Sequence, residues 1–393
     1  MSGIRQSFIF AAEDSFGDGN ADGKYRWFAP PPGSFINTLM KEPGAVSVIR
    51  NAGSKHWSTV SYGQLTGSFQ WSFVLDYNYL SIFYFIFESV ETLEDGTLLF
   101  SKIDTARVKP FTIRRVVLNK MTYEENDPNY DDIYDEISVI KGCIIRQLRM
   151  SRTSSESQFK VEITGSYADE SIEFGDLGRT DWQPYNGDLT EYSCLYIGDS
   201  EESLDFVAVA DSLSIEIGNN AEMIYNICSP FSKTFAEGYS DYSMTVSCYS
   251  NDPWRYKLRM FNGGKLKDEW YTVQDGKVHP VPQSSAITHS TKNLAPMPLS
   301  RIYVYNAEAV DNQEPMYAYE DSSAGIRIDL EDIVINSLAW PKGDGSKLVD
   351  NINSAQCRKI SMRVKLPSGV VADPFDTTVT EDVAPIVTSP VRL

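Results

Sequence analysis

Apolar and polar residues alternate along two neighbouring segments of the chain and predict a β-hairpin. The first segment spans residues 143–150 and the second spans residues 159–164, with a Ser/Thr-rich turn between them. A period of two is the pattern of a strand with one buried face. Residues 110–118 predict a third strand, which the acidic insert Tyr123–Glu136 joins to the hairpin.

The same order of segments recurs in the second half of the chain. Leu213, Ile215 and Ile217 alternate with polar residues as Val46 and Val48 do, and the segment around Met244 alternates as the one around Trp71 does. Farther on, residues 302–304, 325–330 and 360–366 resemble the segments around Phe111, after Gly142, and at 159–163. Repeated order of this kind predicts an internal duplication, although β proteins also repeat such patterns by chance.

Each copy is predicted to carry one short amphipathic helix that packs on its own sheet. In the first copy, residues Tyr79–Val90 place Leu80, Phe83, Tyr84 and Phe87 at the spacing of one helical face. In the second copy, Asp252-Pro253 predicts an N-cap and a first helical position. The apolar stripe that follows consists of Trp254, Leu258 and Phe261.

Four stretches carry a resemblance to a known family. They are Phe8–Gly17, Pro110–Ile113, Ile140–Ile145 and the amphipathic strand Phe159–Thr164. Together they resemble tail tube proteins of non-contractile, siphovirus-like phage tails. The resemblance implies a β-rich unit of the sandwich or half-barrel type, which stacks as rings into the tube that conducts the genome.

The expected fold class is therefore mainly β, with two tandem tail-tube-like domains. We expect an N-terminal arm at 1–43, a first domain at 44–203, a second at 204–366 and an extended C-terminal tail at 367–393. The arm is inferred from turn-rich sequence and consecutive prolines, which exclude a central strand. Three such chains would form the ring that six single-domain subunits form in simpler relatives.

The balance of charge restricts the partners of the protein. The 393 residues include 54 acids and 35 bases, a net charge of −19. This argues against nonspecific binding to nucleic acid, which needs Lys and Arg at the phosphates. It suits a tube lumen along which DNA slides without sticking. The five cysteines form no Cys-x-x-Cys pair, and no secretory signal opens the sequence, so we expect a reduced protein made in the cytosol.

Residues with catalytic chemistry are few and scattered. The three histidines lie far apart, and the sequence contains no metalloprotease, nucleophile-elbow or P-loop motif. The segment from Asp18 to Gly23 matches half of an EF-hand loop, but position 12 is Ala29, so a structural turn is the better interpretation. We expect no enzyme activity, no cofactor and no metal site.

The acidic insert is the predicted contact between stacked rings. It contains seven carboxylates and three tyrosines without any Lys or Arg: Tyr123, Glu124, Glu125, Asp127, Tyr130, Asp131, Asp132, Tyr134, Asp135 and Glu136. A segment with this much charge is not buried within its own domain, so it is expected to project from the sheet. A surface loop without contacts is the alternative. In the resembling family, the loop at this position reaches the adjacent ring.

The resemblance also implies the partners and the location. These are further copies of the chain, the tape measure protein and DNA in the lumen, and the tail terminator and distal tail proteins, in a virion assembled in the host cytoplasm. No membrane is expected. Two alternatives remain open: a distal tail or baseplate ring protein with the same unit, and a carbohydrate-binding adhesion protein whose Tyr and Trp stack on sugars.

Overall fold

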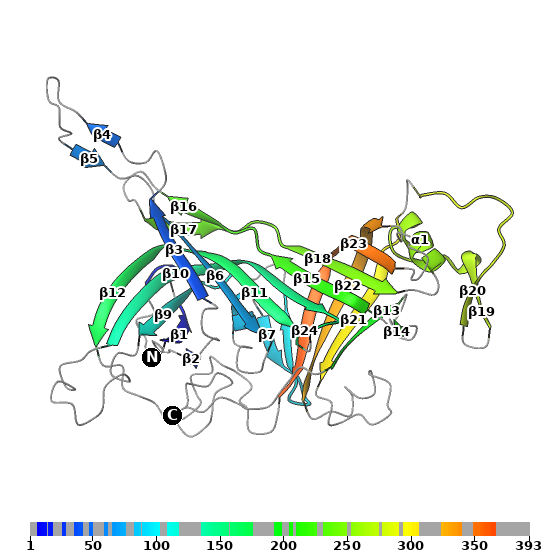
Figure 1. Cartoon of the computed structure of the whole chain (residues 1–393), viewed down its shortest axis with the longest axis horizontal. Coiled ribbons are helices and arrows are strands. Elements are labelled where there is room, and N and C mark those ends of the chain that lie inside the picture. The colour runs from blue at the N-terminus through cyan, green and yellow to red at the C-terminus, as the bar shows by residue number, and fades with distance from the viewer. Residues whose placement is uncertain are drawn as a thin grey trace.

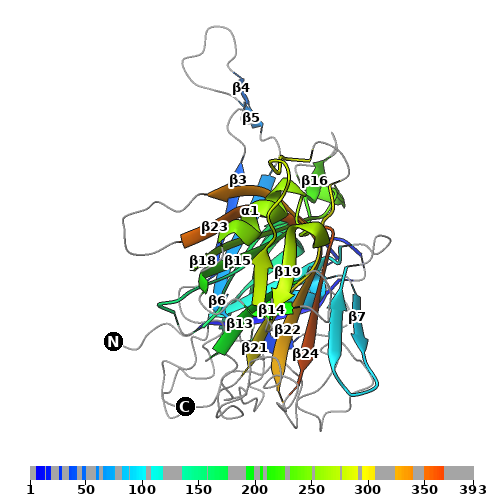
Figure 2. The same cartoon turned by 90° about the vertical axis from the view of Figure 1, so that its right-hand side faces the viewer.

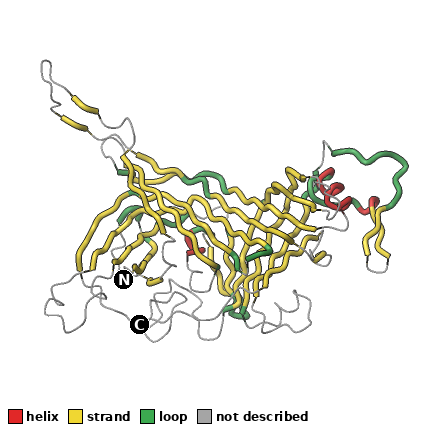
Figure 3. The backbone as a smooth tube through the Cα atoms, in the orientation of Figure 1, coloured by secondary structure: helices red, strands yellow, loops and turns green. Residues whose placement is uncertain are grey.

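Antiparallel β-sheet makes up most of the computed structural model (Figures 1 and 3). This confirms the predicted mainly β class. The structure describes residues 6–13, 15–18, 26–28, 35–41, 47–49, 59–61, 65–75, 82–87, 89–102, 108–117, 135–156, 158–175, 192–198, 204–206, 210–225, 231–249, 253–274, 277–290, 294–305, 324–339 and 349–366. Of the helices in these ranges, none combines the length and apolar character needed to cross a lipid bilayer.

The first half of the chain contributes twelve strands. They are β1 (Gln6–Ala12), β2 (Arg26–Phe28), β3 (Phe35–Lys41), β4 (Ser47–Ile49), β5 (Thr59–Ser61), β6 (Leu65–Val74), β7 (Ser89–Thr92), β8 (Leu98–Ser101), β9 (Phe111–Val117), β10 (Asp135–Thr153), β11 (Lys160–Tyr167) and β12 (Asp169–Gly175).

The second half contributes twelve more strands and two short helices. They are β13 (Tyr192–Gly198), β14 (Leu204–Phe206), β15 (Ala210–Gly218), β16 (Glu222–Tyr225), β17 (Ser232–Ala236), β18 (Asp241–Tyr249), α1 (Pro253–Phe261), the 3-10 helix η5 (Asp268–Trp270), β19 (Tyr271–Gln274), β20 (Lys277–Pro280), β21 (Met297–Tyr305), β22 (Gly325–Ala339), β23 (Val349–Cys357) and β24 (Lys359–Lys365).

A central sheet of eight strands runs through both halves in the order β3-β6-β11-β10-β15-β18-β23-β22. The long strands β10 and β22 each leave this sheet and continue into a second one. The N-terminal part of β10 joins the sheet β2-β1-β9-β10-β12. The N-terminal part of β22 joins the sheet β14-β13-β21-β22-β24-β8-β7.

Within each half, the strands pair in the same scheme. β10 pairs with β9, β11 and β12 as β22 pairs with β21, β23 and β24. β6 lies between β3 and β11 as β18 lies between β15 and β23. A register shift between Ile145 and Gln147 recurs between Ile335 and Ser337, 190 positions later. The twelve strands of the first half are therefore repeated in order in the second.

This pairing corrects three equivalences inferred from the sequence. The counterpart of β15 is β3, whereas Val48 lies in the separate hairpin β4-β5. The counterpart of β11 is β23, whereas the segment 360–366 belongs mainly to β24 and corresponds to β12. Gly142 corresponds to Asp332 and not to Gly325. Alternating apolar residues recur in most strands, so the pattern alone could not align them.

The segment expected to be an N-terminal arm contains strands of the sheets. β1 pairs with β9 along its whole length, and β3 pairs in the same way with β6. Phe8 of β1 is buried and stacks on Trp71, with ring centroids 6.4 Å apart. The range 1–43 is thus part of the first half in its described residues. The expected tail 367–393 lies outside the described residues.

Buried apolar residues from both halves form one contiguous core. Trp71, Leu148 and Ile163 from the first half belong to it, as do Ile215 and Met244 from the second. They lie on one face of the central sheet, where alternation placed them. The halves therefore share a core and a sheet, which is a tighter association than that of domains joined by a linker.

The predicted helix at Tyr79–Val90 is wrong. Residues 82–85 form a single 3-10 turn, and the chain is already extended in β7 from Ser89. Ile82, Phe83, Phe85, Ile86 and Phe87 are all buried. A segment buried on every side has no polar face that would identify its period, and the spacing of Phe83 and Phe87 was fortuitous.

The second predicted helix is confirmed as α1, but its apolar stripe is not the buried face. Trp254, Leu258 and Phe261 are only half-buried. Tyr256 and Met260 pack against the core instead, and Arg259 is 3% exposed, with Nη1 donating to the carbonyl of Gly264 at 3.4 Å.

Candidate functional site

The face of the central sheet opposite the core is polar across both halves. Its side chains come from five adjacent strands: Ser68, Gln70, Ser72, Glu162, Thr164, Ser166, Arg146, Gln147, Arg149, Ser214, Glu216, Ser243 and Thr245. Small hydroxyl and amide groups predominate. Every second residue of these strands is buried in the core, so the residues between them point to this opposite face.

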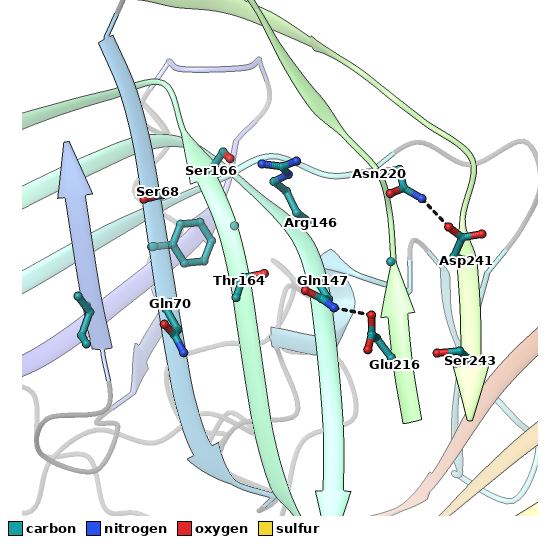
Figure 4. A pocket seen from close by; sticks show the side chains of 14 residues that line it. Ser68, Gln70, Arg146, Gln147, Thr164, Ser166, Glu216, Asn220, Asp241 and Ser243 are labelled. Carbon is teal, nitrogen blue, oxygen red and sulfur yellow. Dashed lines mark hydrogen bonds between the residues drawn. The ribbon is translucent and has the colours of Figure 1, made fainter. Parts of the chain in front are cut away.

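A shallow hollow in this face crosses the junction between the two halves (Figure 4). Its walls come from β3, β6, β11, β10, β15 and β18, and Thr164, Arg146 and Glu216 point into it. The hollow offers hydrogen-bonding groups and a few separated charges. Its described lining includes no His or Cys, and the described ranges contain no cluster of His, Cys, Asp or Glu suited to hold a metal ion.

Acidic and basic groups are balanced on this face. Lys160, Arg146 and Arg149 supply positive charge, while Glu162, Glu216 and Asp241 supply negative charge. Lys160 Nζ lies 2.7 Å from Glu162 Oε1. The described part of the face thus has no net positive patch, although it is less acidic than the chain as a whole.

The junction between β10 and β15 is tightly bonded. The two strands pair over seven residues, from Gln147 opposite Gly218 to Thr153 opposite Ser212. The side-chain amide of Gln147 donates to Glu216, and Arg149 Nε donates to Ser214 Oγ at 3.0 Å. Asn219, which is 1% exposed, donates its backbone N–H to the carbonyl of Arg146 at 2.8 Å.

The two ends of the central sheet are the counterparts of the two strands that meet in this junction. β3, at one end, corresponds to β15 and pairs with β6 alone among the described strands. β22, at the other end, corresponds to β10, and from Val334 onward it pairs only with β23 within the described ranges. Each end therefore presents an edge that its counterpart uses for pairing.

Most of the predicted inter-ring contact lies outside the described residues, which leaves that prediction untested. This applies to Tyr123, Glu124, Glu125, Asp127, Tyr130, Asp131, Asp132 and Tyr134. Asp135 and Glu136 belong to β10, where they pair with Gly175 and Phe174 of β12. Leu80 of the predicted packing residues also lies outside the described ranges. Phe83 and Phe87 are buried, and Tyr84 is half-buried.

Glu13 is a buried carboxylate at the bend of β10. It accepts hydrogen bonds from Gly142 N at 2.8 Å, from Thr112 Oγ1 at 2.6 Å and from Gly17 N at 2.6 Å. Burial raises its pKa above the ordinary value, and these hydrogen bonds oppose the rise. Glu13 thus holds β1, β9 and β10 together at the place where the long strand changes sheets.

An ionic cluster occupies the corresponding sheet of the second half. Asp329 is 5% exposed and lies 2.9 Å from Arg301 Nε and 2.7 Å from Arg327 Nη2. The two guanidinium groups satisfy its oxygens and hold β21 to β22. Cys143 and Cys357 are free thiols, and burial raises the pKa of Cys357 to about 12, which keeps it protonated and unreactive.

Sequence reasoning identified the strands of this site but not the open edges. The signal was present in the repeated order of segments, since a duplicated unit that pairs with its own copy leaves one edge unused at each end. Misaligned counterparts in the second half concealed it. No protein-family model matches the chain, and no curated protein matches it either.

Proposed function

We propose that this protein is a structural subunit that closes into rings by pairing its two open edges, and that the rings stack into a phage tail tube. The observation that supports this most directly is the junction of β10 with β15. It supports the proposal because β10 and β15, which are the counterparts of β22 and β3, already pair within one chain.

In the proposed assembly, the rotation and translation that superpose the first half on the second half also superpose the second half on the first half of the next chain. Repeating it joins β22 of one chain to β3 of another and continues the central sheet. A head-to-tail contact of this type forms a closed ring when the rotation closes and an open filament when it does not. Closure leaves no exposed strand edge in the central sheet, and an exposed edge is a site of aggregation.

The polar face of the central sheet is suited to the lumen of such a ring. Its small hydroxyl and amide groups and balanced charges provide no array of Lys and Arg for phosphates. The wall can then let DNA and the tape measure protein pass without retaining them. Three chains, each with two halves, complete a ring of six units.

The register of the proposed contact follows from the internal junction. Arg149 lies opposite Glu216, and the pairings place Ala339 and Thr38 at the corresponding positions. The double variant Ala339→Cys and Thr38→Cys is expected to form interchain disulfides under mild oxidation, seen as dimers and trimers on non-reducing gels. The matched control Ala339→Cys with Leu39→Cys places the thiols on opposite faces of the sheet and is expected to link poorly.

Imaging of the purified protein tests ring size and stacking. Long tubes in negative stain with three chains per ring are expected. Six chains per ring would contradict closure by duplicated halves. Rings that never stack would favour the distal tail or baseplate alternative, and a persistent monomer that forms no disulfide at residues 38 and 339 would contradict the proposal as a whole.

A further inference from the structure

The hairpin β7-β8 of the first half completes a sheet of the second half. β8 adds to the outer edge of β24, with Leu98 opposite Val364 and Phe100 opposite Met362. All four side chains are fully buried. Figure 2 shows the hairpin lying beside β24 at the side of that sheet. The hairpin β7-β8, called the internal ribbon below, thus comes from the first half and covers a sheet edge of the second half.

The corresponding edge in the first half pairs with no further described strand. β12 is the counterpart of β24, because β10 pairs with it in the register in which β22 pairs with β24. Ile172 and Phe174 therefore occupy the positions of Met362 and Val364. They are 60% and 71% exposed, whereas their counterparts are 0% exposed. An edge strand with exposed apolar side chains is a typical site for pairing with another strand.

The hairpin β19-β20 is the counterpart of β7-β8. It follows α1 and precedes β21, as β7-β8 follows the 3-10 turn and precedes β9. One face carries Tyr271, Val273, Val278 and Pro280, and the other carries Thr272, Gln274, Lys277 and His279. Val273 is 59% exposed. Its strands pair with each other and with no further described strand, and an isolated two-stranded ribbon is marginally stable in water.

The ribbon and the uncovered edge lie at opposite ends of the molecule. Figure 1 shows β19-β20 projecting beyond α1 at the right, and β12 at the far left. The ribbon cannot reach β12 of its own chain in this arrangement, but a neighbouring copy joined end to end brings the two together. The ribbon lies toward the end that presents β22, so both contacts have the same direction along the assembly.

We propose that β19-β20 of one chain adds to the free edge of β12 in the next chain and covers Ile172 and Phe174. This inference rests on the proposed head-to-tail assembly and names a second contact within it. The charges agree with this pairing. β12 carries Asp169, Glu170 and Glu173, and β20 carries Lys277, while in the internal contact the signs are reversed, with Glu91 on β7 and Lys359, Arg363 and Lys365 on β24.

The half-burial of α1 fits the same arrangement. The segment 82–87, which begins with the 3-10 turn, precedes the internal ribbon and is buried at five of its six residues. α1 precedes the projecting ribbon, and Trp254, Leu258 and Phe261 remain partly exposed on it. The segment before the ribbon is thus buried where the neighbouring unit is present and partly open where it is missing.

The double variant Ile172→Asp and Phe174→Asp tests the contact. Both side chains are exposed in the single chain, so its melting temperature is expected to stay unchanged, while the protein concentration needed for assembly rises at least about tenfold. Replacing Tyr271–Pro280 by a Gly/Ser linker is expected to have the same effect from the other side. The matched control Ile224→Asp, an exposed apolar residue of β16 that is 43% exposed, is expected to assemble as the wild type does.

Mixed crosslinking gives a direct readout. A chain with Val278→Cys, mixed with a chain with Phe174→Cys and treated with a short bis-maleimide, is expected to give a mixed dimer. Unchanged assembly of both edge variants, or no mixed dimer in chains that link through residues 38 and 339, would overturn this inference and leave the ring intact. Failure of the link between residues 38 and 339 in the unaltered background would overturn the proposed function itself.

Discussion

Gly142 and Asp332 occupy the same place in two copies of one strand, and both adopt left-handed backbone conformations. Gly142 has φ +63° and Asp332 has φ +54°. The residue that links the two partner strands makes the same backbone hydrogen bond in each half. Ala168 N, between β11 and β12, donates to the carbonyl of Lys141 at 2.9 Å, and Arg358 N, between β23 and β24, donates to the carbonyl of Glu331 at 3.1 Å. The bend that moves β10 and β22 from one sheet to the other is therefore conserved between the halves.

Gly142→Ala is expected to destabilise the protein by about 2–4 kcal/mol, from left-handed strain and a steric clash together. A Cβ on residue 142 would lie 2.8 Å from the Cβ of Ala168. Gly96→Ala is the matched control, since Gly96 has φ +80° but nothing within 4 Å, and it is expected to cost about 1 kcal/mol. Chemical denaturation measures both. Equal losses would show that the bend has room for a side chain.

Phe83→Asp and Leu258→Asp are expected to differ in cost, although the sequence placed both residues on helical stripes. Phe83 is 0% exposed, so an unpaired carboxylate there is expected to cost at least about 4 kcal/mol or prevent folding. Leu258 is half-buried on α1, and its replacement is expected to cost about 1–2 kcal/mol. Phe83→Leu is the control, because it keeps an apolar side chain at this position. Its melting temperature should stay near that of the wild type. A soluble Phe83→Asp variant with unchanged melting would refute the burial of this turn.

The buried carboxyl of Glu13 predicts a stability that falls as pH rises. Its folded pKa is raised above the ordinary 4.5, so its contribution is complete below about pH 4.5 and is lost as pH rises through the folded pKa. Glu13→Gln removes this titration. The difference in unfolding free energy between wild type and Glu13→Gln should therefore shift against the wild type between pH 4 and pH 7. A difference that is flat, or that moves the other way, would contradict the raised pKa.

Deletion of residues 125–134 tests the acidic insert while sparing β10, which begins at Asp135. We expect a folded subunit that still forms rings but yields shorter or salt-sensitive tubes, because the insert is predicted to supply carboxylates for bases on the adjacent ring. Tube length in negative stain at low and high salt measures this. Replacing the same residues with an uncharged linker of equal length separates charge from length. Tubes of normal length and stability in both variants would show that the insert has no role in stacking.

Strands were predictable where one face of the strand is buried and the other is exposed to solvent. β6 and β11 show this, since Trp71 and Ile163 alternate with Gln70 and Thr164. Segments buried on both sides were not predictable, and the helix expected at Tyr79–Val90 is the example. The pairing of β1 with β9 was not predictable, because the two strands lie about 100 residues apart and turn-rich neighbours dominate the local pattern.

The equivalence of the halves was predictable in outline and not in register. Gly142 suggested Gly325 by residue type, whereas its structural counterpart is Asp332, in which a charged side chain tolerates the left-handed bend and pairs with Arg358. Backbone geometry is retained at this position while residue identity is not. The open edges at β3 and β22, and the uncovered Ile172 and Phe174, follow only from the pairing and could not be read from composition.

The junction of β10 and β15 has a kinetic consequence for the proposed ring. The two strands belong to one chain, so they meet at a tethered effective concentration on the order of millimolar or more, whatever the amount of protein in solution. Every second contact around the ring is then made when the chain folds. Three chains, and not six separate subunits, then have to meet to form a ring. An incomplete ring lacks one or two whole chains, so its gap always spans both halves of a chain.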